Sequence, residues 1–332
     1  MKTKHLASLA LAAAMLAAGP LASAQTLLNA SYDVAREFYK DYNAAFVAHY
    51  KKTTGKDVKI DQSHAGSSTQ ARAVTDGLDA DVVTFNTTTD IDFLASKGLV
   101  ASEWTKRFPN GAAPTTSTML FLVRNGNPKA IKDWDDLIKP GVQVVVVNPK
   151  TGGNGRMAYL AAWGSVRKKG GTDAQAAEFV GKLYKNVPIL AKGGRDATAI
   201  FLQRNIGDVL ITFESEVVSV DREFGTGKVD AIHPSSSLVT ENPVAVVERT
   251  TAKKGTGELA KAYLDYLYSD EAQEIAAKHA IRPRNPAILK KYASTFKPVQ
   301  LFTVQDYFGS LGEAQKVHFN DGGKFDQLYT VK

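Results

Sequence analysis

Four short segments rich in Gly, Ser, Thr and Asn each follow an apolar run and precede a helical pattern. They are residues 31–33, 63–69, 149–155 and 192–196. The first turn of a helix has unpaired N–H groups and a partial positive charge, so it attracts anions. Glycine lets the backbone approach a ligand closely, and hydroxyl groups add donors. One such segment is usually a helix cap, but four in one chain predict a site for a small oxyanion.

Strands and helices alternate along the chain, and these elements must position the four segments. Apolar, β-branched runs predict strands over residues 25–30, 58–61, 81–85, 118–124, 143–148, 187–191, 208–213 and 242–248. Apolar periodicity predicts a helix from Asp33 and others over 67–77, 156–168, 197–205 and 256–278. This alternation is typical of an α/β fold with mostly parallel sheets, in which ligands bind beyond the carboxyl ends of the strands.

The chain length of 332 residues predicts about two domains. Loops at Pro114 and Pro243 precede two strands that we expect to cross between lobes. The prediction is a discontinuous lobe I over 25–114 plus 243–332, and an inserted lobe II over 115–242.

The first 24 residues have the pattern of a secretory signal peptide. A basic start is followed by the apolar run Leu6 to Ala18 and by Ala22-Ser23-Ala24. The apolar run is too short to span a bilayer. We expect cleavage after Ala24, which leaves an exported chain of 308 residues.

Composition excludes several classes of site. The chain has no cysteine, which excludes disulfides, Fe–S clusters, cysteine-based zinc sites and cysteine nucleophiles. The net charge of +7 is spread without a basic run, so we expect no nucleic-acid partner. The histidines show no metal-ligand spacing, and no GxSxG or phosphate-loop motif is present. Gly153-x-Gly155-x-x-Ala158 mimics a dinucleotide fingerprint, but no convincing strand with an acidic end follows it. We therefore expect no catalytic residue, metal or cofactor.

Two further groups of residues have alternative interpretations. Glu214 and Glu216 follow a buried strand, and the commoner case of salt-bridged or solvated carboxylates is favoured over a catalytic pair. Trp104, Trp134 and Trp163 fit core or rim packing better than a stacking platform.

Motifs along the whole mature chain resemble the periplasmic sulfate/thiosulfate-binding proteins of ABC importers. They include Asn29-Ala-Ser-Tyr-Asp33, Asp61-Gln-Ser-His-Ala-Gly-Ser67, Asn148-Pro-Lys, Tyr159-Leu-Ala-Ala-Trp-Gly164, Ile206-Gly-Asp-Val-Leu-Ile211, Arg282-Pro-Arg284 and Phe325-Asp-Gln327. The resemblance implies a monomeric periplasmic receptor whose two lobes close on dehydrated sulfate or thiosulfate and deliver it to a membrane permease. The anion would be held without cationic contacts. The implied donors are the backbone N–H groups of Asp33, Ser67, Gly153, Asn154 and Gly194, and the Ser67 hydroxyl.

The chain departs from the family pattern at three positions. The family usually has a serine at Gly152 and often a tryptophan at Phe213, so two donors are missing here. Hydrogen bonds to a charged group contribute about 1.5–3 kcal/mol each. The two missing donors weaken binding unless Thr151, Asn154, Ser68 or water substitutes, and we predict that Thr151 or Asn154 does.

Asp196 stands where the family usually has glycine, which raises an alternative ligand. A carboxylate facing the cleft would repel sulfate but accept the O–H of a protonated oxyanion such as hydrogen phosphate. The simpler interpretation makes Asp196 a helix cap or a partner of Arg195. An exported phosphoryl- or sulfuryl-transfer enzyme and a surface adhesion role remain further alternatives.

Overall fold

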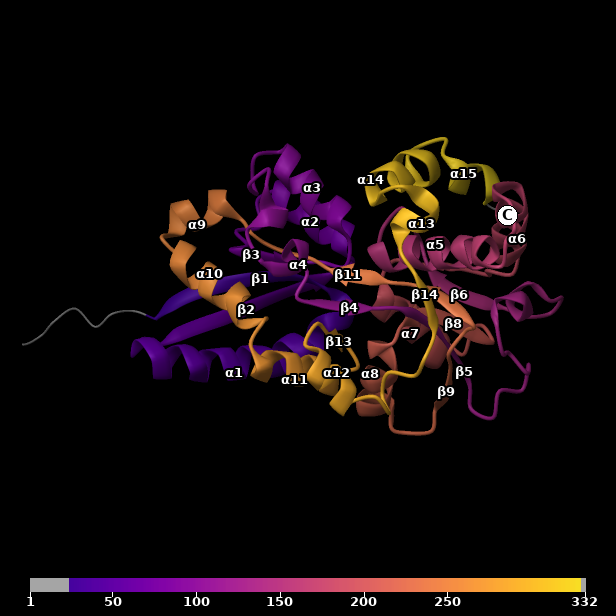
Figure 1. Ribbon diagram of the computed structural model, residues 1–332, viewed down its shortest axis with the longest axis horizontal. Coiled ribbons are helices and arrows are strands. Elements are labelled where there is room, and N and C mark those ends of the chain that lie inside the picture. The colour runs from indigo at the N-terminus through magenta and orange to yellow at the C-terminus, as the bar shows by residue number, and fades with distance from the viewer. Residues whose placement is uncertain (1–23, 330–332) are drawn as a thin grey trace, which may run out of the picture.

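The computed structural model describes residues 24–329, which form two α/β halves side by side (Figure 1). The predicted signal peptide lies outside the described residues, apart from Ala24. No helix in the range 24–329 has both the length and the apolar character needed to cross a membrane.

The first half is built on a four-stranded sheet of order β12-β3-β1-β2. Its strands are β12 (Val244–Val246), β3 (Val82–Thr84), β1 (Gln25–Tyr32) and β2 (Val58–Ala65). β1 pairs in parallel with β2 and β3, whereas β12 is antiparallel to β3. Figure 1 shows α1 (Arg36–Thr54) on one side of β1 and β2, and α2 (Ser67–Thr75) and α3 (Thr88–Ser96) on the other.

The second half contains a five-stranded sheet of order β7-β6-β8-β5-β9. Its strands are β7 (Leu190–Ala191), β6 (Val144–Val147), β8 (Val209–Phe213), β5 (Met119–Arg124) and β9 (Val229–Ile232). β6 is parallel to β7 and β8, but β5 is antiparallel to both β8 and β9. The α/β fold is confirmed, with mixed sheets in place of mostly parallel ones.

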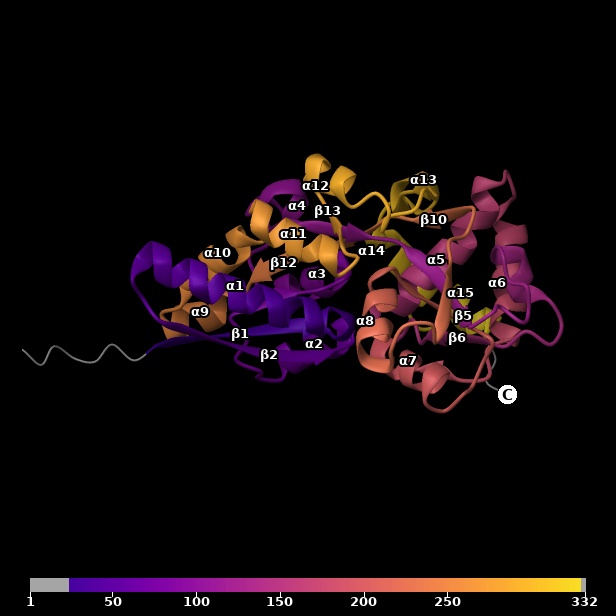
Figure 2. The ribbon, with the colours of Figure 1, turned by 90° about the horizontal axis from the view of Figure 1, so that it is seen from below.

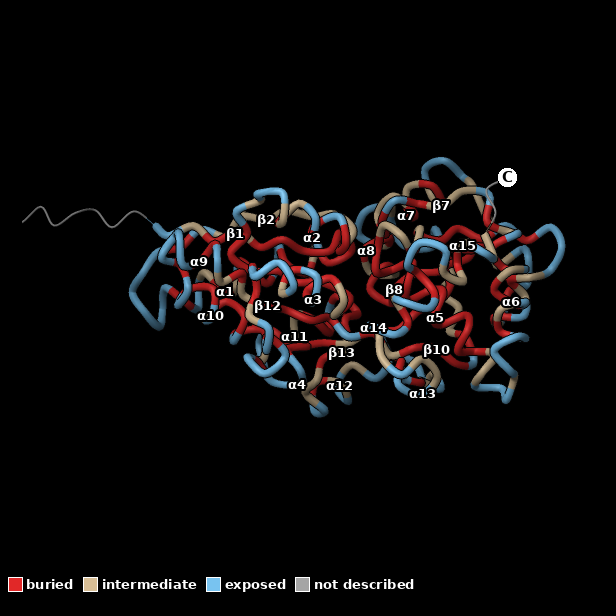
Figure 3. The backbone as a smooth tube through the Cα atoms, turned by 90° about the horizontal axis from the view of Figure 1, so that it is seen from above, coloured by how far each residue is buried: buried red, intermediate tan, exposed pale blue. Residues whose placement is uncertain are grey.

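Alternating side chains of the second sheet enter two separate cores. Phe121 of β5 and Val146 of β6 pack in the cluster that contains α5 (Gly153–Lys168) and α6 (Asp173–Lys185). Their neighbours Leu122 and Val145 pack in the cluster under α7 (Gly194–Leu202) and α8 (Ser215–Phe224). Because successive side chains of a strand point to opposite faces, a continuous apolar run is what a sheet covered on both faces requires. Figure 3 shows these buried segments in red at the centre of each half.

A small three-stranded sheet lies between the halves. It consists of β11 (Thr240–Asn242), β4 (Thr115–Ser117) and β13 (Arg282–Pro283), with β4 antiparallel to the other two. Figure 1 shows β4 and β11 running from one half to the other. The crossings therefore lie directly beside the predicted strands 118–124 and 242–248, whose main parts belong to the large sheets.

The C-terminal segment packs on the second half, whereas the sequence analysis places it in lobe I. It contains β14 (Gln300–Phe302), which pairs with β10 (Ser236–Leu238), followed by α13 (Val304–Phe308), α14 (Leu311–Ala314) and α15 (Lys324–Leu328). Phe302, Phe319 and Phe325 belong to the same apolar cluster as α5 and α6. We therefore propose a lobe division in which residues 300–329 join lobe II.

The remaining helices cover the first half and the region between the halves. They are α4 (Pro109–Ala112), α9 (Glu248–Lys254), α10 (Gly257–Tyr266), α11 (Asp270–Lys278) and α12 (Pro286–Lys291). The single helix predicted over 256–278 is thus two helices. The second begins anew because the Ser269 hydroxyl accepts a hydrogen bond from the N–H of Ala272.

Candidate anion-binding site

The four predicted segments meet between the two halves. A Cβ atom placed on Gly66 would lie 3.2 Å from the carbonyl oxygen of Thr151 and 3.6 Å from that of Lys192. A Cβ on Gly193 would lie 2.7 Å from Oδ2 of Asp33. Figure 2 shows α2 of the first half beside α7 and α8 of the second. Gly66 and Gly193 therefore lie where segments of the two halves approach each other closely.

The N-terminal residues of three helices supply N–H groups at this junction. Ser67 begins α2, Gly153 and Asn154 begin α5, and Gly194 begins α7. A helix offers no internal acceptor to the N–H groups of its first turn. Within residues 24–329 these four N–H groups have no other acceptor either. They can therefore donate to a small anion.

Asp33 occupies the same junction through its side chain. It begins a short 3-10 turn (Asp33–Ala35), and its Oδ2 accepts a hydrogen bond of 3.0 Å from the N–H of Arg195 in α7. The carboxylate thus lies on the helix start of the opposite half. Burial raises the pKa of Asp33, and hydrogen bonds from the Arg195 and Val34 N–H groups oppose that shift.

The hydroxyl and amide side chains predicted as donors are mostly engaged with protein. The Thr151 hydroxyl donates to the carbonyls of Asn148 and Lys192, at 3.2 and 3.1 Å. The Ser68 hydroxyl donates to Asp90, and the Ser67 hydroxyl donates to Oδ1 of Asn86 at 2.7 Å. The Thr151 and Ser68 hydroxyls thus donate to protein groups in this structure. That either of them donates to the anion stays a prediction.

Asn154 is in a different situation. Its Nδ2 donates to the Thr212 hydroxyl at 3.3 Å, whereas its buried Oδ1 has no partner within residues 24–329. The amide of Asn154 is therefore held less firmly by the protein than the hydroxyls of Thr151 and Ser68 are. That Asn154 replaces a missing donor stays a prediction.

The three departures from the family pattern lie at or beside the junction. Gly152 is the N-cap of α5 and has an extended backbone, so it provides no side-chain donor. Phe213 is buried at the end of β8, with its ring centroid 6.4 Å from that of Tyr32 in the other half. Asp196 lies in the first turn of α7, and its Oδ2 accepts a hydrogen bond of 2.8 Å from the N–H of Lys192, just before the helix. That bond fits the helix-cap interpretation of Asp196.

A buried ion pair joins the two halves beside the junction. Arg156 Nη2 of α5 lies 2.9 and 2.8 Å from the two carboxylate oxygens of Asp90 in α3, and 2.7 Å from the Ser68 hydroxyl. The two charged side chains are only 9% and 7% exposed. The positive charge of Arg156 is therefore balanced inside the protein.

A second arginine is also balanced by carboxylates. Arg195 pairs with Glu223 and lies 3.7 Å from Glu216, whose other oxygen accepts from the Thr198 hydroxyl. Glu216 is fully buried, and desolvation raises its pKa to about 7. Glu214 forms a two-point salt bridge with Arg282 at 2.7 Å. The salt-bridge interpretation of Glu214 thus fits the structure. The core interpretation fits the three tryptophans, which are all buried.

Asn86 is a residue of this junction that the sequence analysis missed. It follows β3, is 2% exposed, and contacts both Ser67 and the first residue of α5. A polar residue directly after the strand 81–85, ahead of three threonines, repeats the pattern of the other segments and was the available signal.

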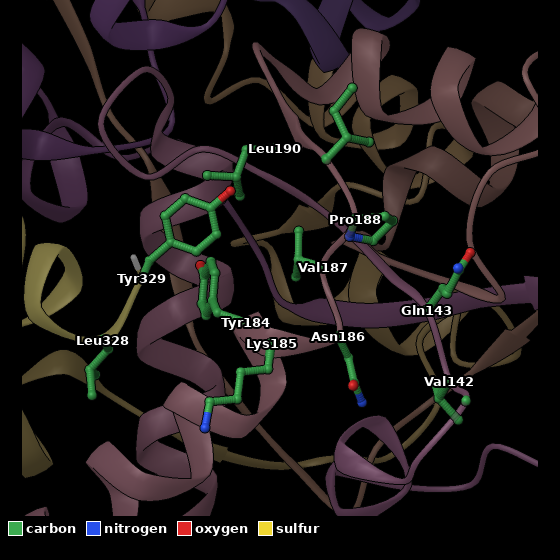
Figure 4. A pocket seen from close by; sticks show the side chains of 12 residues that line it. Val142, Gln143, Tyr184, Lys185, Asn186, Val187, Pro188, Leu190, Leu328 and Tyr329 are labelled. Carbon is green, nitrogen blue, oxygen red and sulfur yellow. The ribbon is translucent and has the colours of Figure 1, made fainter. Parts of the chain in front are cut away.

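A cavity in the second half lies away from the junction. It measures about 680 Å³ and is lined by Tyr184, Val187, Leu328, Tyr329 and neighbours in the second half (Figure 4). It contains none of the helix N-termini described above. No group of three or more potential metal-binding side chains occurs within residues 24–329.

Comparisons with known proteins agree with this geometry. The family described as bacterial extracellular solute-binding proteins matches residues 27–282. A thiosulfate-binding protein of Pseudomonas aeruginosa is 56% identical and covers 98% of this chain and 99% of its own length. A sulfate-binding protein of Escherichia coli is 51% identical, covering 91% and 92%. The solved structure of the sulfate-binding protein SubI from Mycobacterium tuberculosis superposes with a TM-score of 0.80 at 31% identity, covering 88% of this chain and 98% of that one.

Proposed function

The chain belongs to the family of bacterial extracellular solute-binding proteins, and from that premise we propose that it is a receptor for sulfate or thiosulfate. It binds the anion between its two halves, closes on it, and delivers it to the permease of an ABC importer. The relatives named thiosulfate-binding and sulfate-binding protein support the ligand class.

One observation supports this proposal most directly: N–H groups that have no acceptor among residues 24–329 meet at three helix starts. They come from α2 in the first half and from α5 and α7 in the second. An anion there would receive several charge-assisted hydrogen bonds and would link the halves. The nearby Arg156 and Arg195 are already paired with carboxylates, so backbone dipoles would hold the ligand.

Closure follows from donors that are divided between two halves. With α2 in one half and α5 and α7 in the other, only the closed arrangement offers all the hydrogen bonds at once. A ligand that binds one arrangement more tightly shifts the population toward it. The strands β4 and β11 connect the halves and are the natural place for the bending motion.

The phosphate alternative depends on Asp196, and the structure favours the helix-cap interpretation of that residue. That carboxylate accepts a hydrogen bond from the Lys192 N–H, which supports its interpretation as a helix cap. An exported phosphoryl- or sulfuryl-transfer enzyme is also disfavoured, since the family and the named relatives are binding proteins. We propose that the chain is a receptor and not an enzyme.

We further propose that the protein acts in the periplasm as a monomer after cleavage behind Ala24. The basic and apolar pattern of the first 24 residues supports export.

Isothermal titration calorimetry on the chain from Gln25 onward tests the function. Sulfate, thiosulfate and phosphate are titrated separately at pH 6 and pH 8. We expect one saturable site for sulfate or thiosulfate, and small-angle scattering should show a more compact protein with the anion present. Binding of phosphate in preference to both sulfur anions would restore the alternative. If none of the three anions binds, the proposed function is wrong.

A further inference from the structure

Asn86 contacts both halves at the junction. Its backbone N–H donates to the Ser67 hydroxyl oxygen at 3.2 Å, and its Oδ1 accepts from the same hydroxyl at 2.7 Å. The side chain therefore lies on the first turn of α2. A Cβ atom on Gly153 would overlap Oδ1 of Asn86, so the same amide also rests on the first residue of α5.

The nitrogen end of this amide makes no hydrogen bond in the part of the chain that the structure describes. Asn86 is 2% exposed, yet within residues 24–329 no acceptor is found for its Nδ2 group. This nitrogen can therefore donate to a group that enters the junction. The amide of Asn86 lies against the first residues of α2 and α5, where the proposed function places an anion.

We infer that Asn86 Nδ2 donates a hydrogen bond to the bound anion and that Ser67 acts through it. The inference rests on the proposed function. A serine hydroxyl has one proton, and in this structure Ser67 gives it to Asn86 Oδ1. The Ser67 hydroxyl is then a positioning group that fixes the amide, while the Ser67 backbone N–H remains available to the ligand.

The same arrangement adds a donor for fully ionised anions. Because the Ser67 hydroxyl donates to Oδ1, the amide is held with its Nδ2 donor available to a ligand. Sulfate and thiosulfate have only acceptors, whereas hydrogen phosphate also needs a partner for its O–H. Asn86 thus compensates for one of the donors missing at Gly152 and Phe213.

Three variants test the inference by calorimetry with sulfate and thiosulfate. Asn86→Ala should weaken binding about 10- to 100-fold, the range for one hydrogen bond to a charged group. Asn86→Asp keeps the shape but replaces the donor with a carboxylate. It should weaken sulfate binding more than the alanine variant does, and it should raise the ratio of phosphate to sulfate affinity. Asn320→Ala, at an exposed asparagine of the C-terminal segment, is the control and should bind like the wild type.

A double-mutant cycle with Ser67→Ala separates the two roles. If Ser67 only positions Asn86, the double variant should bind no more weakly than Asn86→Ala alone, because the interactions are coupled. Additive losses in the cycle, or wild-type affinity in the isosteric Asn86→Asp variant, would overturn the inference. Absence of any sulfur-anion binding by the wild type would instead refute the proposed function.

Discussion

At the scale of single residues, Gly152 offers a direct measure of what a side-chain donor adds to this site. Its backbone is extended, with φ of −149° and ψ of 143°, which any residue adopts. A Cβ atom there would lie 3.1 Å from Cγ1 of Val147, a tight contact that a small shift of one methyl group relieves. A serine should therefore fit.

We predict that Gly152→Ser binds sulfate about tenfold more tightly than Gly152→Ala. Both variants add the same Cβ atom, and only serine adds a hydroxyl beside the start of α5. Tenfold corresponds to about 1.4 kcal/mol, near the lower end for a hydrogen bond to a charged group. Calorimetry on the pair gives the ratio. Equal affinities would mean that position 152 does not face the ligand.

Glu216 makes the stability of the protein depend on pH. Desolvation raises its pKa from 4.5 to about 7, against the opposing charge of Arg195. The folded protein therefore binds more protons than the unfolded chain between these two values. Stability from this group is fully present below pH 4.5 and is lost as the pH rises through about 7. Asp33, whose pKa is also raised by burial, contributes with the same sign.

Glu216→Gln should accordingly be more stable than the wild type above pH 7, by roughly 1 to 3 kcal/mol. Below about pH 4.5 the advantage should disappear, since both side chains are then neutral. Urea unfolding at several pH values measures the difference. A difference that stays constant with pH would show that Glu216 does not titrate in this range.

At the scale of elements, the starts of α5 and α7 explain both the success and the shortfall of the sequence analysis. Gly-rich segments after apolar strands predicted helix starts near 156 and 197, whereas the helices begin at Gly153 and Gly194. Gly and Asn are poor helix formers, so propensity argues against the first turn of α5. A Cβ on Gly155 would lie 2.8 Å from backbone atoms of Asn148 and Pro149, so close packing requires glycine inside the helix.

The contact of Asn86 with α5 could not be predicted from the sequence, because it depends on how two distant segments are placed relative to each other. Local patterns identify that a strand ends in polar residues, but they do not show which side chain reaches across to another helix. Asn86 and Gly153 are 67 positions apart in the chain, and nothing in either neighbourhood encodes their distance. For the same reason, the hydrogen bonds that occupy Thr151 and Ser68 could not be predicted.

Gly153 gives a test of closure at this scale. We predict that Gly153→Ala folds normally but binds sulfate at least 100-fold more weakly, because a Cβ there overlaps Asn86 and Thr87 of the opposite half. Each half can retain its own core while the two are kept apart. Small-angle scattering with saturating anion should show less compaction than in the wild type.

Gly181→Ala is the matched control for that variant. Gly181 lies within α6, and its added Cβ would make only an ordinary contact of 3.6 Å with Leu328. Binding should be unchanged, and stability should rise slightly because alanine favours the helix. If Gly153→Ala also bound and compacted normally, the halves would not close through this contact.

At the scale of the whole molecule, the chain passes between its halves once more than the two crossings that the sequence predicts. It enters the second half through β4, returns through β11, and reaches the second half again in β14. The last passage could not be predicted because the segment 300–329 consists of short elements without strong periodicity. Its aromatic residues nevertheless complete the core of α5 and α6. Bending between the halves must therefore involve the connection from β13 to β14 as well as β4 and β11.

The contact between Gly164 of α5 and Phe302 of β14 tests that third passage. A Cβ on Gly164 would overlap the ring of Phe302, which is 2% exposed. Gly164→Ala alone should destabilise the protein by about 1–3 kcal/mol through overpacking, and Phe302→Ala alone by about 3–5 kcal/mol through a cavity. In the double variant the new methyl group enters the space left by the ring. The double variant should therefore be more stable than the sum of the two changes predicts, by at least about 1 kcal/mol in urea unfolding. Additivity would mean that the two residues do not touch in solution, and that the C-terminal segment is not a fixed part of the second half.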